Sequence, residues 1–188
     1  MRIDKLKNNF LYLIFLLIFS FFYSDASMAD KFYISSGKYA LCTTAECFPI
    51  PGQIGMTLCH CKVENGNSAG QELNPAVKTT AEGYQLIKSR YYPVETYVQC
   101  SNSRPWAFCL DSPCIIDKND PSKAVCTCSV VQNQGPYIIP TDTCDKSLCE
   151  NGRIYSSALV TQNNDIEEFL KSTEGAGKFP AAQKKLCK

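Results

Sequence analysis

Twelve cysteines and a single histidine, His60, are the side chains of this 188-residue chain with the widest range of possible chemistry. Cysteine sulfurs can bind a metal ion, cycle between thiol and disulfide, or cross-link a fold. An imidazole is the most common general base in enzyme mechanisms. The spacing of the cysteines and the compartment of the protein decide among these uses.

Eight cysteines form two sets that share the spacing C-x4-C-x11-C-x-C. Residues 38–63 match residues 105–130 at an offset of 67 without a gap, and Tyr39 then coincides with Trp106. This agreement predicts two tandem copies of one unit. A weaker match at an offset of 63 aligns residues 88–96 with residues 151–159. The two sets are Cys42, Cys47, Cys59 and Cys61, followed by Cys109, Cys114, Cys126 and Cys128.

The spacing favours structural disulfides over a metal or redox site. C-x4-C and C-x-C differ from the C-x2-C pairs of common zinc modules, so we predict no metal and no cofactor. A redox dithiol is less favoured because the motif occurs twice within an even set of cysteines. Residues two apart on a strand share a face, which predicts nested bridges in each unit. These are Cys42–Cys61, Cys47–Cys59, Cys109–Cys128 and Cys114–Cys126.

Four further cysteines lie outside the two sets. In the downstream register, Cys144 and Cys149 fall on Ala81 and Leu86, so both are absent from the first unit. Joint absence predicts that Cys144 bonds Cys149, which leaves Cys100 for Cys187. That pairing requires a turn, because a five-residue separation on a helix exceeds the reach of a disulfide.

No catalytic residue can be assigned from the sequence. His60 lies between two bridged cysteines, and Thr127 takes its place in the second unit, so we expect an exposed strand residue. The segment DKNDPSK, from Asp117, begins like a calcium loop but lacks the glycine and glutamate of an EF-hand. The acidic residues are scattered and offer no recognisable carboxylate pair.

Short apolar runs and turn residues predict a mainly β fold of the α+β class. Each unit contains two short strands joined by a loop, which makes a Cys-rich β-hairpin. Residues 79–89 predict a short helix with a capping box, and residues 90–98 and 152–160 predict strands. Asn164 is the expected N-cap of a C-terminal helix that ends near Lys171.

The N-terminus predicts export. Three basic residues precede a 13-residue apolar run, residues 11–23, which is too short to span about 30 Å of hydrocarbon. We therefore predict a signal peptide, residues 1–29, and no stable membrane insertion after its cleavage. The first repeat unit is then residues 30–96, the second is residues 97–160, and residues 161–188 form the C-terminal helix and tail.

Charge and composition limit the partners. Lys and Arg number 19 against 18 Asp and Glu, so the basic excess that nucleic-acid binding needs is missing. No Asn-x-Ser/Thr acceptor site follows residue 29, which favours a bacterial exported protein. Tyr91, Tyr92 and Trp106 are candidate binding residues, since large aromatic side chains dominate recognition sites. Packing in the core is the alternative role for them.

We therefore expect a monomeric, secreted or periplasmic binding module without catalysis. Its partner would be a protein or carbohydrate outside the cytoplasm. An exported hydrolase with unrecognised acidic residues is one alternative, which a pocket with carboxylates of shifted pKa would favour. A proteinase-inhibitor-like protein is the other, and residues 48–55 and 115–122 are the loops that would protrude.

Overall fold

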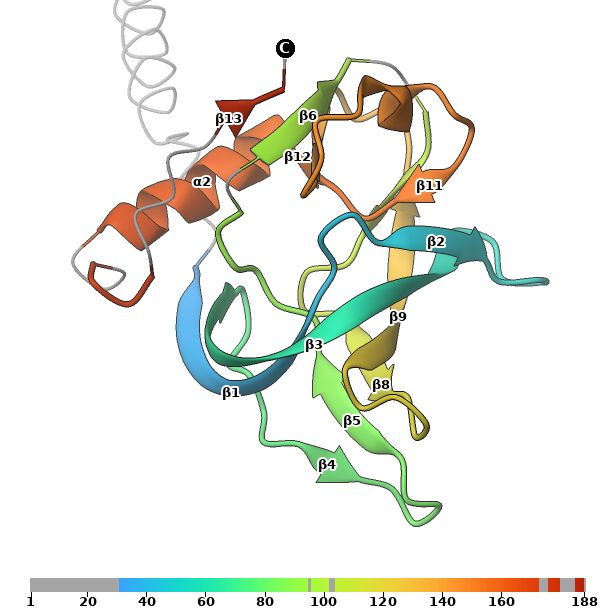
Figure 1. Ribbon diagram of the computed structural model, residues 1–188, viewed down its shortest axis with the longest axis vertical. Helices are drawn as coiled ribbons and strands as arrows, with labels where there is room; N and C mark the ends of the chain where they lie inside the picture. Colours follow the sequence, from blue (N-terminus) through green and yellow to red (C-terminus); the bar gives the residue numbers. More distant parts are fainter. Residues whose placement is uncertain (1–30, 95, 102–103, 173–175, 180–184, 188) are drawn as a thin grey trace, which may run out of the picture. The chain divides into compact units, whose positions relative to one another are not determined.

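The computed structural model describes residues 31–94, 96–101, 104–172, 176–179 and 185–187, which belong to one compact unit (Figure 1). The predicted signal peptide, residues 1–29, lies outside the described residues. A mainly β fold with a C-terminal helix is confirmed. The helical elements among the described residues are the 3-10 helix η1 (Lys146–Cys149) and the α-helix α2 (Val160–Lys171).

Two sheets account for the strands in the described part of the chain. The larger one follows the order β11-β2-β3-β9-β8-β5-β4, with β1 also paired to β3 and β7 to β9. Its strands are β1 (Tyr33–Leu41), β2 (Glu46–Pro49), β3 (Met56–Gly70), β4 (Lys78–Thr79), β5 (Gln85–Lys88), β7 (Trp106–Phe108), β8 (Pro113–Ile116), β9 (Lys123–Val131) and β11 (Ile154–Tyr155).

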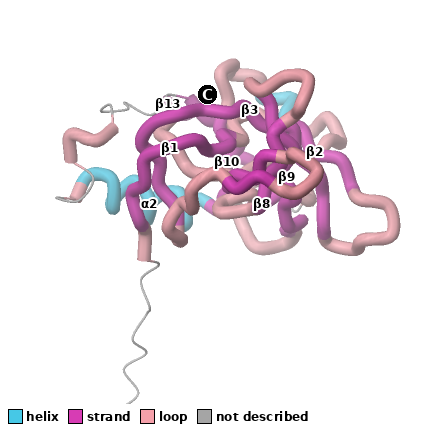
Figure 2. Tube along the Cα trace, turned by 90° about the horizontal axis from the view of Figure 1, so that it is seen from below, coloured by secondary structure: helices cyan, strands magenta, loops and turns pink. Residues whose placement is uncertain are grey.

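The smaller sheet has the order β12-β10-β6-β13, and its strand β12 directly precedes the C-terminal helix α2 in the chain. Its strands are β6 (Thr96–Cys100), β10 (Tyr137–Pro140), β12 (Ala158–Leu159) and β13 (Lys185–Leu186). Helix α2 buries Ile166 in a cluster with Phe32 and Ala69. Both views place α2 on the side of the molecule away from β2 and β8 (Figure 2).

The centre of the large sheet is the antiparallel pair β3 and β9. Cys59 lies opposite Cys126 in this pair, and the register continues outwards from Cys59 to Cys47 on β2 and from Cys126 to Cys114 on β8. Four half-cystines thus form one row across four neighbouring strands. The alternation of β3 buries Thr57, Cys59 and Cys61 on one face and exposes Leu58 and His60 on the other.

The nested bridges expected from the spacing are present in both sets of cysteines. In these four bridges the Cα atoms of the two bonded cysteines are 4.0 to 4.7 Å apart. Neighbouring bridges are also in contact, since Cys42 Sγ lies 3.8 Å from Cys126 Sγ. Two groups of three sulfurs are close enough to surround a metal ion, but every one of these sulfurs is already bonded in a disulfide.

The predicted pairing of the other four cysteines is wrong. Cys100 bonds Cys149, and Cys144 bonds Cys187. The reason is local: Lys146–Cys149 forms the helical turn η1, with Asp145 as its N-cap. This turn separates Cys144 from Cys149 and directs Cys149 towards β6.

The predicted helix over residues 79–89 is also wrong, because the chain forms a hairpin of β4 and β5 there. Gly83 has a left-handed φ of +78°, and its N–H donates to the carbonyl of Thr80, which closes the turn. In β5, Leu86 is exposed and Ile87 is buried.

Three other boundaries differ from the expected ones. Residues 90–98 enter a strand only from Thr96, and residues 152–160 divide into β11 and β12. Helix α2 begins at Val160 rather than after Asn164. Its first turn is capped by Gln162, whose Oε1 accepts from the N–H of Leu159 at 3.1 Å.

Oxidative refolding should depend on disulfide exchange. Four of the six bridges skip at least one cysteine in chain order, and sulfurs of different bridges lie in contact, so incorrect pairs must form and be broken. We expect a several-fold higher yield of the native bridges in a glutathione redox buffer than under air oxidation alone. Peptide mapping without reduction measures both yields, and equal yields would contradict this expectation.

Candidate functional site

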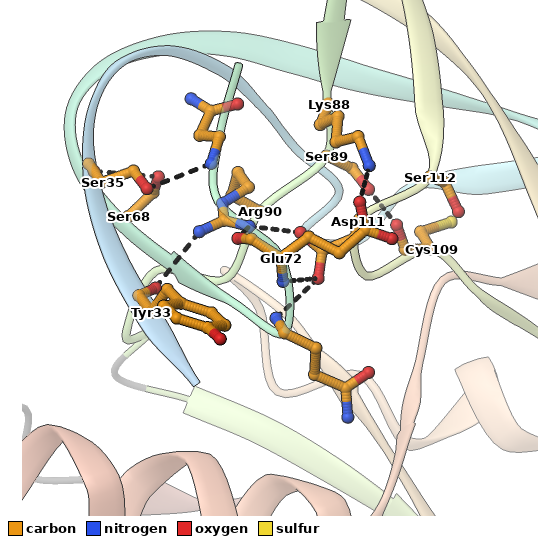
Figure 3. Close-up of polar contacts among 12 residues, drawn as sticks. Tyr33, Ser35, Ser68, Glu72, Lys88, Ser89, Arg90, Cys109, Asp111 and Ser112 are labelled. Atoms are coloured by element: carbon orange, nitrogen blue, oxygen red, sulfur yellow. Dashed lines mark hydrogen bonds and ion pairs between the residues drawn. The ribbon is translucent and has the colours of Figure 1, made fainter. Parts of the chain in front are cut away.

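A buried ion pair between Arg90 and Asp111 is the most connected polar cluster that the structure describes (Figure 3). The two side chains are 0% and 7% exposed. The Arg90 guanidinium also donates to the carbonyls of Glu72, at 2.5 Å, and Tyr33, at 3.2 Å. Asp111 Oδ2 accepts from the N–H of Gln71 at 2.6 Å.

This cluster connects three parts of the chain that are distant in sequence. Tyr33 begins β1, Glu72 follows β3, and Asp111 lies in the loop before β8. Space around the pair is fully used, since a Cβ at Gly70 would clash with both the guanidinium and the carboxylate. In a buried pair of this kind, loss of either partner leaves an uncompensated charge in the interior, so we interpret the cluster as structural.

Removal of one partner should therefore be costly. Asp111→Asn keeps the shape and suits the left-handed φ of +58° at this position, but leaves the Arg90 charge buried and unpaired. We expect a loss of about 3–5 kcal/mol in the free energy of unfolding, measured with urea. The matched control is Asp142→Asn, because its pair with Lys62, at 3.5 Å, is exposed and should be worth about 0–1 kcal/mol. Equal small losses in both variants would contradict the role given to Arg90.

A cavity of about 90 Å³ lies between the loops that follow β1 and β7 and is bounded by α2. Seven pairs of its lining residues are related by the offset of 67, among them Cys42 with Cys109, Ser89 with Ser156, and Tyr91 with Ala158. The offset found in the two cysteine sets therefore also relates residues that line this cavity. The lining is mainly apolar, and Gln162 and Asn163 of α2 add amide groups.

The candidate binding residues do not lie together. Tyr91 and Tyr92 line the cavity, whereas Trp106 does not. Trp106 is 2% exposed and stacks on Tyr137, with ring centroids 5.7 Å apart. Trp106 thus occupies the core position that was the alternative role for it. Burial raises the pKa of Tyr91, and the nearby Glu167 carboxylate adds to this rise, so the phenol is neutral at physiological pH.

The cavity lacks the acidic groups that a hydrolase would need there. No carboxylate lies among its described lining residues. Three exposed carboxyls have shifted pKa values, and each shift is downward. Hydrogen bonds cause these shifts: from Thr80 to Glu82, from Lys123 and Ser122 to Asp120, whose pKa falls to about 2, and from Ser147 to Asp145. The part of the chain that is described therefore does not supply the feature that favours the hydrolase alternative.

The two loops considered for proteinase inhibition consist of tight turns. Gly52 and Gly55 take left-handed φ values of +78° and +79° in the first loop, where Ile54 is fully exposed. In the second loop Asp117 and Asp120 accept from N–H groups two residues further along the chain. The inhibitor alternative stays a prediction.

The face of the large sheet opposite the cysteines is apolar and exposed. We define this outer face by Phe48, Leu58, Val125, Ile115 and Leu86. Phe48 lies opposite Leu58, and Val125, Ile115 and Leu86 are successive neighbours on β9, β8 and β5. Phe48 is 51% exposed, Ile115 46%, and Leu58 and Leu86 36% each. His60 is exposed on the same face, as expected, and contacts the Phe48 ring.

The outer face was not predicted from the sequence, although the sequence of β3 contains a signal for it. In the run MTLCHCKV, Leu58 directly precedes the buried Cys59 and therefore lies on the other face of the strand, and Val125 stands in the same position before the buried Cys126. Apolar residues on both faces of a strand indicate either a sheet covered on both sides or an exposed apolar surface.

The comparisons with known proteins add no relative. No family model, curated protein or solved structure matches the chain. Among the described residues, no helix combines the length and the apolar composition that crossing a membrane requires. The outer face and the cavity are therefore the features of the structure that bear on its function.

Proposed function

We propose that this chain is an exported, disulfide-rich, non-catalytic module that binds another protein through the outer face. The observation that carries the proposal is the exposure of four large apolar side chains, one each on β2, β3, β8 and β5 of the large sheet. Soluble monomers rarely expose contiguous apolar surface of this kind unless it is an interaction site. The partner lies outside the cytoplasm, in the periplasm or the extracellular space.

The charges around the outer face support a protein partner. Charged side chains gather at its rim, where Glu46 pairs with Arg153 at 3.0 Å and Lys123 with Asp120 at 2.7 Å. An apolar centre with a charged rim is the usual composition of a protein interface. A carbohydrate would need more polar partners than Leu58, Ile115 and Leu86 provide.

The disulfides support both export and binding. All twelve cysteines are among the described residues and all are bridged, which is compatible with an oxidising compartment. Cys47–Cys59 and Cys114–Cys126 also fix the strands beneath Phe48 and Ile115. A rigid surface loses little conformational entropy when it binds, so more of the contact energy appears as affinity.

We also infer that the two cysteine sets belong to two copies of one unit. Thr44 and Asp111, which are 67 residues apart, share a left-handed φ, of +50° and +58°. At the same offset, the backbone N–H of Ser89 donates to the carbonyl of Ser112, and that of Ser156 to the carbonyl of Ala45, both at 2.9 Å. The offset of 67 thus extends past the cysteines and replaces the downstream offset of 63.

In this two-unit arrangement, the units exchange strands. Strand β5 of the first unit pairs with β8 of the second, and β11 of the second pairs with β2 of the first. Each unit therefore donates a strand to the other, and together they form one continuous sheet. The outer face extends across both units for this reason.

Site-specific photo-crosslinking tests the proposed function. A photoreactive phenylalanine at Ile115 of the full chain, produced in its own cells, should give one discrete protein adduct. The matched control is Leu73, which is 68% exposed but lies outside the outer face. We expect the adduct yield at Leu73 to be at least tenfold lower, and Leu58→Lys to reduce the yield at Ile115 by a similar factor.

Three outcomes would overturn the proposal. Equal adduct patterns from Ile115 and Leu73 would show that the outer face has no specific partner. An adduct of twice the mass of the chain would identify a second copy as the occupant. Adducts with lipid alone would identify a membrane surface in place of a protein.

A further inference from the structure

One of the six disulfides differs from the other five in its exposure. All twelve cysteines are among the described residues, and Cys144 is the one half-cystine that is exposed to solvent. Its partner Cys187 is buried, with 7% of its surface exposed. The four bridges of the two cysteine sets are buried at both ends. In the sixth bridge, Cys100 is 1% exposed and Cys149 is partly buried.

Exposure decides which disulfide an external thiol can reach. Thiol–disulfide exchange begins when a thiolate attacks one sulfur of the bridge, so its rate depends on access to that sulfur. Cys144 lies in the loop between β10 and η1, where a thiolate can approach the bridge without prior unfolding. Buried half-cystines react only after the elements around them have opened.

Loop length does not distinguish the two bridges that lie outside the cysteine sets. The bonded residues are 43 positions apart in Cys144–Cys187 and 49 apart in Cys100–Cys149. Loop-closure entropy grows only with the logarithm of this length, so both bridges restrict the unfolded chain to nearly the same extent. Cys100–Cys149 is therefore a matched internal reference for the effect of exposure.

The exposed bridge holds strand β13 against the smaller sheet. This strand has two residues and lies beside β6 in a parallel pair, with Leu186 opposite Tyr97 (Figure 1). The N–H of Cys187 adds one hydrogen bond, to the carbonyl of Tyr97 at 3.0 Å. Leu186 is 40% exposed and buries little apolar surface. So few contacts do not offset the conformational entropy that the ordered strand loses, and the covalent bond supplies the difference.

We propose that Cys144–Cys187 is a redox site, at which an external dithiol reduces the bridge and releases β13 while the other five bridges stay intact. A thiolate of the dithiol attacks Cys144 Sγ and forms a mixed disulfide, and Cys187 leaves as a thiolate that takes up a proton. The second thiolate of the reagent then attacks the reagent sulfur of the mixed disulfide and frees the Cys144 thiol. Two electrons and two protons thus pass to the protein, and the dithiol becomes a disulfide.

Release of β13 changes one edge of the smaller sheet. Strand β6 pairs with β10 on one side and with β13 on the other, so the reduced chain has β6 as an open edge. An open edge carries unpaired N–H and C=O groups, to which an extended segment of another chain can add. The oxidised bridge therefore keeps this edge closed, and its reduction opens it.

Graded reduction of the purified, fully oxidised chain tests the redox site. The chain is held in native buffer with increasing dithiothreitol, quenched with excess N-ethylmaleimide in denaturant, and mapped by mass spectrometry. We expect labelling of Cys144 and Cys187 at a dithiothreitol concentration at least tenfold lower than that for Cys100 and Cys149. Equal labelling of the two pairs would show that exposure does not select the bridge. Loss of all six bridges in one step would show that reduction requires global unfolding. Either result overturns the proposal.

A variant without the bridge tests the release of β13. Cys144→Ser combined with Cys187→Ser places hydroxyls where the reduced chain has thiols. We expect the amides of residues 185–187 to exchange with solvent at least tenfold faster than in the oxidised chain, and the amides of β3 and β9 to keep their protection. Unchanged protection of residues 185–187 would show that β13 stays paired without the bridge, and would contradict the release. If the variant does not fold, the selectively reduced chain is measured in its place.

The redox site and the proposed function fail separately. Neither of these experiments involves a residue of the outer face, and crosslinking from Ile115 is carried out with all six bridges formed.

Discussion

The stacking of four cystines across β3 and β9 is the interaction on which the rest of the structure depends. Of the fourteen buried residues in the central core cluster, eight are half-cystines and four are alanines, which leaves only Ile87 and Ile116 as large aliphatic side chains. The sulfur atoms therefore supply most of the side-chain volume that leucine and phenylalanine supply in an ordinary domain. They also cross-link the strands that they fill, so packing and covalent restraint have the same source.

The exposed outer face follows from this core. Because cystines fix the strands from one side, the residues on the opposite side, such as Leu58 and Ile115, are not needed to bury the sheet and remain exposed. The alanines that fit beside the cystines are small, so the strands approach one another closely on the cystine side. The outer face is thus the side of the sheet that a cystine core leaves available for binding.

The sequence predicted what depends on local pattern. The two-residue spacing of Cys59 and Cys61 predicted the buried face of β3 and the nested bridges. The apolar spacing of Ile166 and Phe169 predicted helix α2. It did not predict features that depend on contacts between distant residues. Nothing near Arg90 indicates Asp111, and nothing near β5 indicates β8. The two local errors have local causes: Gly83 closes a hairpin where a capping box suggested a helix, and η1 separates Cys144 from Cys149.

Native-state hydrogen exchange tests the central claim most directly, because it ranks the stability of each element in the folded protein. If the cystine core is the most stable part of the fold, the amides of β3 and β9 around Cys59 and Cys126 exchange only through global unfolding. They would then be the slowest in the chain, and the amides of α2 and β6 would exchange through smaller openings. Slowest exchange in β6, β10 and α2, with local opening of β3 and β9, would contradict the central role of the cystine core.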